Sequence, residues 1–192
     1  MTVSIIAWTI AIIVLAGALA VSISAIRFKN PMLALFAAIP VAVGLAGVAF
    51  ATTIPAPDHA VGVVTGILLA IVGIVAGSPI TVAVLGLAAR GSGSRAVAGQ
   101  HGGIIVDDLG NSLLPAARIE VLRGGTIIGY LERLAVIASV VLGHLEIIAV
   151  LIAVKGLGRY SELDSAEVRE RFIIGTLVSL VWAGACALLI VL

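Results

Sequence analysis

Charge is what this sequence has least of. Of its 192 residues only 11% are Asp, Glu, Lys or Arg, whereas 61% are hydrophobic. A water-soluble domain carries about 25% charged residues, because its surface must stay hydrated. This chain has too few charges to cover a water-facing surface, so most of its surface must face lipid. The net charge of +1 offers no basic excess for nucleic acid, and we expect no nucleic-acid partner.

Cysteine and the common catalytic motifs are also scarce. The single Cys186 lies in the last apolar run, so an intrachain disulfide is excluded. The chain contains no G-x-S-x-G, H-E-x-x-H or paired-Cys motif, and its Gly-rich segments lack a Walker lysine. No cofactor is predicted, and the sequence leans against an enzyme. A cleaved signal peptide is not expected either, because no basic residue precedes the first apolar run.

Apolar runs of membrane-spanning length make up most of the chain. A spanning helix needs about 20 apolar residues, and residues 3–26, 32–53, 60–89 and 172–192 meet this requirement. Pro40 predicts a kink in the second run. Gly77-Ser78-Pro79 should bend or break the third run, unless that long helix tilts.

Residues 126–160 form a further apolar run that is too long for one span. A single helix over 126–155 would be about 45 Å long, against a hydrocarbon core of roughly 30 Å. Two short helices, 126–143 and 145–160, meeting at Gly143-His144, solve this mismatch. With six spans, the basic residues outside the apolar runs all fall on one side of the membrane, as the positive-inside rule requires. These residues are Arg27, Lys29, Arg90, Arg95, Arg118, Arg123, Arg159, Arg169 and Arg171.

The sequence therefore predicts an all-α, polytopic transmembrane helix bundle of about six spans, including a short-helix hairpin at 126–160. We divide the integrated membrane domain into a three-helix part at 1–89, a cytoplasmic loop at 90–125 and a second three-helix part at 126–192. Both termini are predicted outside and the loop inside. A short surface helix is considered around 116–122, and Asp164-Ser165-Ala166-Glu167 resembles a capping box before the last helix.

Two charges within the hairpin are expected to meet. Glu132 and Lys155 both lie roughly 8–10 Å below the cytoplasmic surface, given a rise of 1.5 Å per residue. An unpaired charge in hydrocarbon costs at least about 2.5–3.5 kcal/mol, so Glu132 should pair with Lys155 or with Arg159. This cluster of predicted charges also includes Glu170 and Arg171. It is interpreted either as a structural ion-pair cluster or as a coupling site in a transport path.

Arg133, next to Glu132, should point off that face and reach the cytoplasmic head groups. Small residues at three- and four-residue spacing predict helix-packing faces, because they let backbones approach closely in lipid. These residues are Gly62, Gly66, Gly73 and Gly77 in the third helix and Gly175, Ser179 and Ala183 in the last.

Polar groups in the loops offer two further candidate sites. On the outer face, Asp58, His59, His144 and Glu146 would suit a divalent metal if their two loops touch, since imidazole and carboxylate bind zinc-like ions. The alternative is that they are ordinary polar turns. In the inner loop, Asp107-Asp108 resembles the acidic motif of magnesium-dependent lipid-modifying enzymes, although the second acidic set that such enzymes need is missing.

The C-terminal motifs resemble known but uncharacterised families. They are G-x-x-I-G-x-x-E-R from Gly125, K-x-x-x-R from Lys155 and I-G-T-L from Ile174. They are similar to small polytopic membrane proteins of actinobacteria over the last 70 residues, and to the C-terminal helices of a bacterial membrane domain of unknown function. The resemblance implies a multi-pass protein of the bacterial inner membrane and implies no activity.

Three functions remain open from the sequence. The first is a non-enzymatic subunit, scaffold or assembly factor, the second a small transporter or channel, and the third a lipid-modifying enzyme. The expected partners are membrane lipid, a protein bound through the 90–125 loop and a second copy of the chain.

Overall fold

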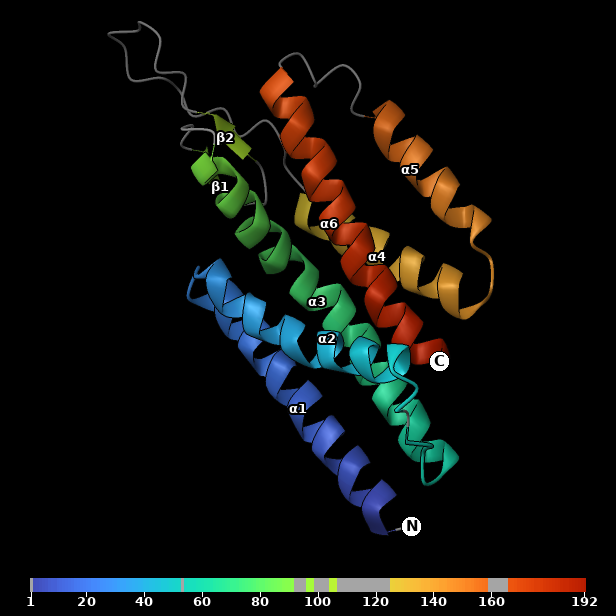
Figure 1. The fold of residues 1–192 in the computed structure, drawn as a ribbon. Coiled ribbons are helices and arrows are strands. Elements are labelled where there is room, and N and C mark those ends of the chain that lie inside the picture. Colours follow the sequence, from blue (N-terminus) through green and yellow to red (C-terminus); the bar gives the residue numbers. More distant parts are fainter. Residues whose placement is uncertain (1, 53, 92–95, 99–103, 107–124, 159–165) are drawn as a thin grey trace, which may run out of the picture.

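The computed structural model describes residues 2–52, 54–91, 96–98, 104–106, 125–158 and 166–192. This part of the chain forms six α-helices, one 3-10 turn and two short strands (Figure 1). The helices are α1 (Thr2–Arg27), α2 (Leu35–Ala49), α3 (His59–Gly91), α4 (Gly125–Val141), α5 (Glu146–Gly158) and α6 (Ala166–Val191). The 3-10 turn, η1 (Pro31–Ala34), leads directly into α2.

The predicted all-helical membrane bundle is confirmed. Four segments are long and apolar enough to cross a membrane: Thr2–Arg27, Pro31–Ala49, His59–Ala88 and Val168–Val191. The hairpin helices are shorter, with 17 residues in α4 and 13 in α5. At 1.5 Å per residue they measure about 26 Å and 20 Å, less than the roughly 30 Å hydrocarbon core. Four segments therefore have the length of a full span, and the predicted number of about six spans is approximate.

The helices α3 and α6 form an antiparallel central pair (Figure 1). Glycines on each helix lie against side chains of the other: Gly66 against Ile190, Gly73 against Cys186, and Gly175 against Thr81 and Leu85. One apolar cluster packs α1, η1 and α2 onto this pair, and a second packs α4 onto it. Close approach at small residues increases van der Waals contact between helices, which drives association in lipid.

The break expected at Gly77-Ser78-Pro79 does not occur. The helix α3 is continuous over 33 residues with Pro79 inside it. Proline has no N–H, so the Val75 carbonyl lacks its helical donor, and the helix continues past this single missing bond. A helix of about 50 Å exceeds the hydrocarbon core, so α3 must tilt or project from the membrane.

The two short helices predicted for 126–160 are present and meet at a tight turn. The backbone N–H of His144 donates to the Ser139 carbonyl at 2.8 Å, which closes the end of α4. Gly143 has a φ of +75°, a conformation that costs other residues about 1–2 kcal/mol. A glycine at this position thus lets the chain reverse directly after α4.

The segment predicted as a loop contains regular structure that the sequence did not predict. Strands β1 (Ala96–Ala98) and β2 (Ile104–Val106) pair antiparallel, with Ala96 opposite Val106. Valine and isoleucine favour this extended conformation. The considered helix at 116–122 and the Asp107-Asp108 pair lie outside the described residues, as do Asp164 and Ser165 of the suggested capping box.

Candidate functional site

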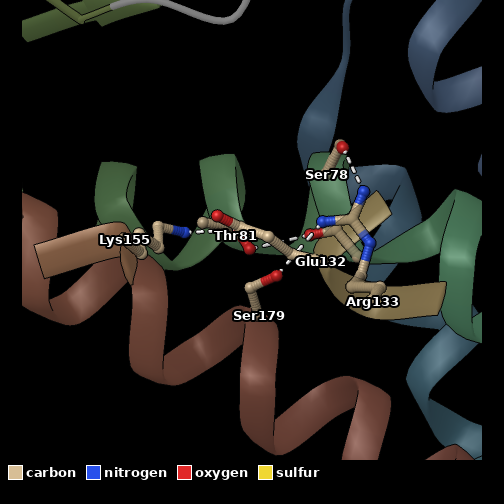
Figure 2. Close-up of polar contacts among 7 residues, drawn as sticks. Ser78, Thr81, Glu132, Arg133, Lys155 and Ser179 are labelled. Atoms are coloured by element: carbon tan, nitrogen blue, oxygen red, sulfur yellow. Dashed lines mark hydrogen bonds and ion pairs between the residues drawn. The ribbon is translucent and has the colours of Figure 1, made fainter. Parts of the chain in front are cut away.

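Arg133 of α4 is buried between the two central helices. Only 3% of the surface of Arg133 is exposed. Nε donates to the Ile74 carbonyl at 2.8 Å, Nη2 to Ser78 Oγ at 2.7 Å and Nη1 to Ser179 Oγ at 3.1 Å (Figure 2). One side chain therefore joins α4 to both α3 and α6. The expectation that Arg133 reaches the head groups is wrong, because α4 packs against α3 and α6 on this face.

Glycines make the space that the guanidinium occupies. A Cβ on Gly77 of α3 would lie 2.6 Å from Arg133 Nε and 3.0 Å from Cζ. Gly129, one turn before Arg133 in α4, would place a Cβ 3.3 Å from Nη1. The Tyr130 ring completes the surroundings, with its centroid 5.3 Å from Cζ, within the range of a cation–π contact.

The Arg133 guanidinium lies beside Ser179, near the middle of α6, and α6 is long enough to cross a membrane. Ser179 follows Ala166 by 13 residues and precedes Val191 by 12, so it lies about 20 Å and 18 Å from the two ends of α6. A positive charge at that depth costs at least about 2.5–3.5 kcal/mol in hydrocarbon. Hydrogen bonds to a charged group contribute about 1.5–3 kcal/mol each. The three bonds of Arg133 can therefore offset the cost of burying it.

Glu132 makes the second polar link, on another side of α4. Its Oε2 accepts from Lys155 Nζ of α5 at 2.5 Å. The two side chains are only 11% and 20% exposed, respectively. Lys155 also lies over the Phe172 ring of α6, 5.8 Å from its centroid. Successive helical residues point about 100° apart, so Glu132 holds α5 while Arg133 holds α3 and α6.

The remaining charges of the predicted cluster are not all brought to this site. Glu170 is exposed near the beginning of α6, and Arg171 beside it is partly buried. Arg159, the alternative partner of Glu132, lies outside the described residues. Of the predicted cluster, the structure shows the Glu132–Lys155 ion pair at this site. Arg133, which was not part of the predicted cluster, lies next to it.

The small residues proposed for helix packing have different surroundings. Gly66, Gly73, Gly77 and Gly175 each lie against a side chain of another helix. Ser179 and Ala183 are buried on α6, with exposures of 6% and 0%. Gly62 lies instead against Ala56 in the segment that precedes α3.

The structure does not bring the four candidate metal ligands together. All four lie in the described part of the chain, and no three His, Cys, Asp or Glu side chains there could hold an ion together. Asp58 instead accepts from the Val61 N–H at 2.8 Å and caps α3. His144 Nδ1 contacts Glu146 Oε1 at 2.9 Å within the exposed hairpin turn. Asp58 and the His144–Glu146 pair therefore each make contacts within their own turn.

The sequence did not predict the hydrogen bonds of Arg133 to Ile74, Ser78 and Ser179, or the space that Gly129 leaves beside the guanidinium. A signal for one of them exists, since Gly129 and Arg133 are four residues apart and share a helix face. The pairing of Arg133 with Ser78 and Ser179 has no such signal, because the partners are 55 and 46 residues away.

Comparison of the chain with protein-family models, curated proteins and solved structures finds no match.

Proposed function

We propose that this multi-pass membrane protein is a non-enzymatic subunit or scaffold of a membrane complex. The observation that carries the proposal is the use of Arg133 as a bond between three helices. Its three hydrogen bonds go to a backbone carbonyl and two hydroxyls of the same chain. A side chain that is 3% exposed and bound in this way is suited to holding helices together.

The Glu132–Lys155 pair supports the same role. It attaches α5, which has no buried residue of its own, to the rest of the bundle. Apart from α4, no described element has backbone close to α5. The outer side of α5 carries exposed apolar residues, among them Val150 and Val154. We infer that α5 is a surface for lipid or for a protein subunit, with the 90–125 loop as a second contact region.

Orientation follows from the placement of basic residues. We propose that the loop at 90–125 faces the cytoplasm of a bacterial cell and that both termini face outward, because cationic residues favour the inner side. Cysteines placed at Ser94 and at His144, in a Cys186→Ser background, test this topology. An impermeant thiol reagent should label the second position and not the first in intact cells. Labelling at Ser94 would contradict the orientation.

A small transporter is the second candidate, favoured by the depth of Arg133. Ionisable residues in the middle of a membrane often line ion or substrate paths. On this reading, Glu132 and Lys155 would exchange partners during transport. The continuity of α3 removes one argument for this function, since discontinuous helices mark many transporter sites.

One experiment separates the two candidates. The full chain is purified under mild solubilisation, bound proteins are identified by mass spectrometry, and the same preparation is reconstituted for flux measurements beside a Glu132→Gln variant. The scaffold proposal expects a stoichiometric protein partner and no flux. Flux that disappears in a folded Glu132→Gln protein, without any partner, would overturn it.

A further inference from the structure

The hydroxyl groups around Arg133 differ from most other hydrogen-bonded hydroxyls of the helices, because they accept and do not donate. Five serine and threonine side chains in the helices donate to the carbonyl four residues earlier, the usual arrangement for such residues. They are Thr9, Ser22, Thr65, Thr81 and Ser139. Ser78 and Ser179 instead accept hydrogen bonds from Arg133. Within the described part of the chain, neither of these two hydroxyls donates to any acceptor.

Arg133 has N–H groups that make no hydrogen bond within the described residues. A guanidinium carries five N–H groups, and three of them bond Ile74, Ser78 and Ser179. Two N–H groups and two hydroxyl hydrogens therefore gather around one side chain with no acceptor among the described residues. Burying donors without acceptors is costly, at about 1–3 kcal/mol for each group.

The local charge has the same sign as this excess of donors. The cluster contains two cations, Arg133 and Lys155, and one carboxylate, Glu132, which is bonded to Lys155. The other acidic side chains that the structure describes are at or near helix ends: Asp58, Glu146 and Glu170. One positive charge in the middle of the bundle thus has no counter-charge bonded to it in the described chain.

We propose that Arg133, Ser78 and Ser179 bind a small monovalent anion of the size of chloride. An anion accepts hydrogen bonds from several donors at once, and it neutralises the remaining positive charge. Ser78 is partly exposed, unlike Arg133 and Ser179, so the anion reaches the site beside Ser78. The site does not depend on the proposed scaffold role, since a bound anion would complete the helix contacts in a scaffold or a transporter alike.

Chloride is the probe for the test. The purified full chain is unfolded thermally at chloride concentrations from 1 to 300 mM, with gluconate, which is much larger, keeping the ionic strength constant. Ligands that bind the folded state raise the melting temperature in a saturable way. We expect such a rise for the natural sequence. Binding of radioactive chloride to the folded protein, at one ion per chain, provides a second measurement.

Matched serine variants identify the site. Ser78→Ala and Ser179→Ala each remove one hydroxyl donor and should raise the chloride concentration at half-saturation about tenfold, the size expected from one hydrogen bond to a charged ligand. Ser139→Ala is the control, because Ser139 is buried like Ser179 but already donates to the Ala135 carbonyl. It should leave the half-saturation point unchanged.

The outcomes are distinct. The proposal would be overturned if the melting temperature did not change with chloride concentration and no radioactive chloride bound to the folded protein. An equal shift in Ser139→Ala and Ser78→Ala would also overturn it, since the anion would then act elsewhere. Failure of the scaffold role would appear differently, as flux or as the absence of a protein partner.

Discussion

Replacement of Gly77 by alanine is the sharpest test of how Arg133 is held. The added Cβ would lie 2.6 Å from Arg133 Nε and 3.0 Å from Cζ, so the guanidinium must move. We expect the Nε–Ile74 and Nη2–Ser78 hydrogen bonds, at 2.8 Å and 2.7 Å, to be lost in that movement. A change of one methyl group should therefore break the hydrogen bonds by which Arg133 links α4 to α3.

The size of the effect follows from two opposing contributions. Losing two hydrogen bonds to a charged group costs about 3–6 kcal/mol. Alanine in place of glycine stabilises a helix by about 1 kcal/mol. The free energy of unfolding should fall by about 2–5 kcal/mol. Unfolding of the purified chain in mixed micelles with increasing dodecyl sulfate, followed by circular dichroism, measures this change.

Gly86 of the same helix provides the control. A Cβ at Gly86 would meet no atom within 4 Å, so Gly86→Ala should be neutral or stabilising by up to about 1 kcal/mol. In an Arg133→Ala background the clash is removed, and Gly77→Ala should behave like Gly86→Ala. The coupling between the two sites should be at least about 2 kcal/mol. The reasoning fails if Gly77→Ala costs the same with and without Arg133.

Three further predictions concern the hairpin and the beginning of α3. Lys155→Met leaves Glu132 without its partner and should lower the free energy of unfolding by about 2 kcal/mol, whereas adding Glu132→Gln to it should restore most of that loss; no recovery in the double variant would argue against the ion pair. Gly143→Ala forces alanine into a positive φ and should cost about 1 kcal/mol in the same unfolding assay, and an unchanged stability would mean that the turn can be rebuilt. Asp58→Ala removes the cap of α3 and should cost about 1 kcal/mol, while Asp58→Asn should retain most of the stability because the amide oxygen also caps; equal losses in both would contradict the capping role.

Hydropathy determined most of what could be known before the structure. The lengths of the apolar runs gave the long helices because a bilayer demands about 20 apolar residues in each. The excess length of residues 126–160 required a hairpin, and Gly143 provides the turn at the expected place. The mismatch between helix length and membrane thickness can be read from the sequence, because it depends on no tertiary contact.

Proline position was a weaker guide. Pro79 was expected to bend or break the third helix unless that helix tilted, yet α3 continues through it. In a bundle, packing against neighbouring helices stabilises a helix that has lost one backbone bond; Pro79 is buried, and α3 packs against α1, α4 and α6. Whether a proline interrupts a membrane helix depends on these neighbours, which the local sequence does not contain.

The sequence by itself determined that the chain is a helical membrane protein, that residues 126–160 fold back, and that Glu132 needs a nearby cation. Only the tertiary structure decided where the Arg133 side chain lies and which groups it bonds. The sequence predicts that Arg133, one residue after Glu132, points off that face and reaches the cytoplasmic head groups. In the folded chain α4 lies between α5 and the α3–α6 pair, so both faces are covered. The partners of Arg133 come from helices 46 to 59 residues away, and only packing brings such distant groups within hydrogen-bonding distance.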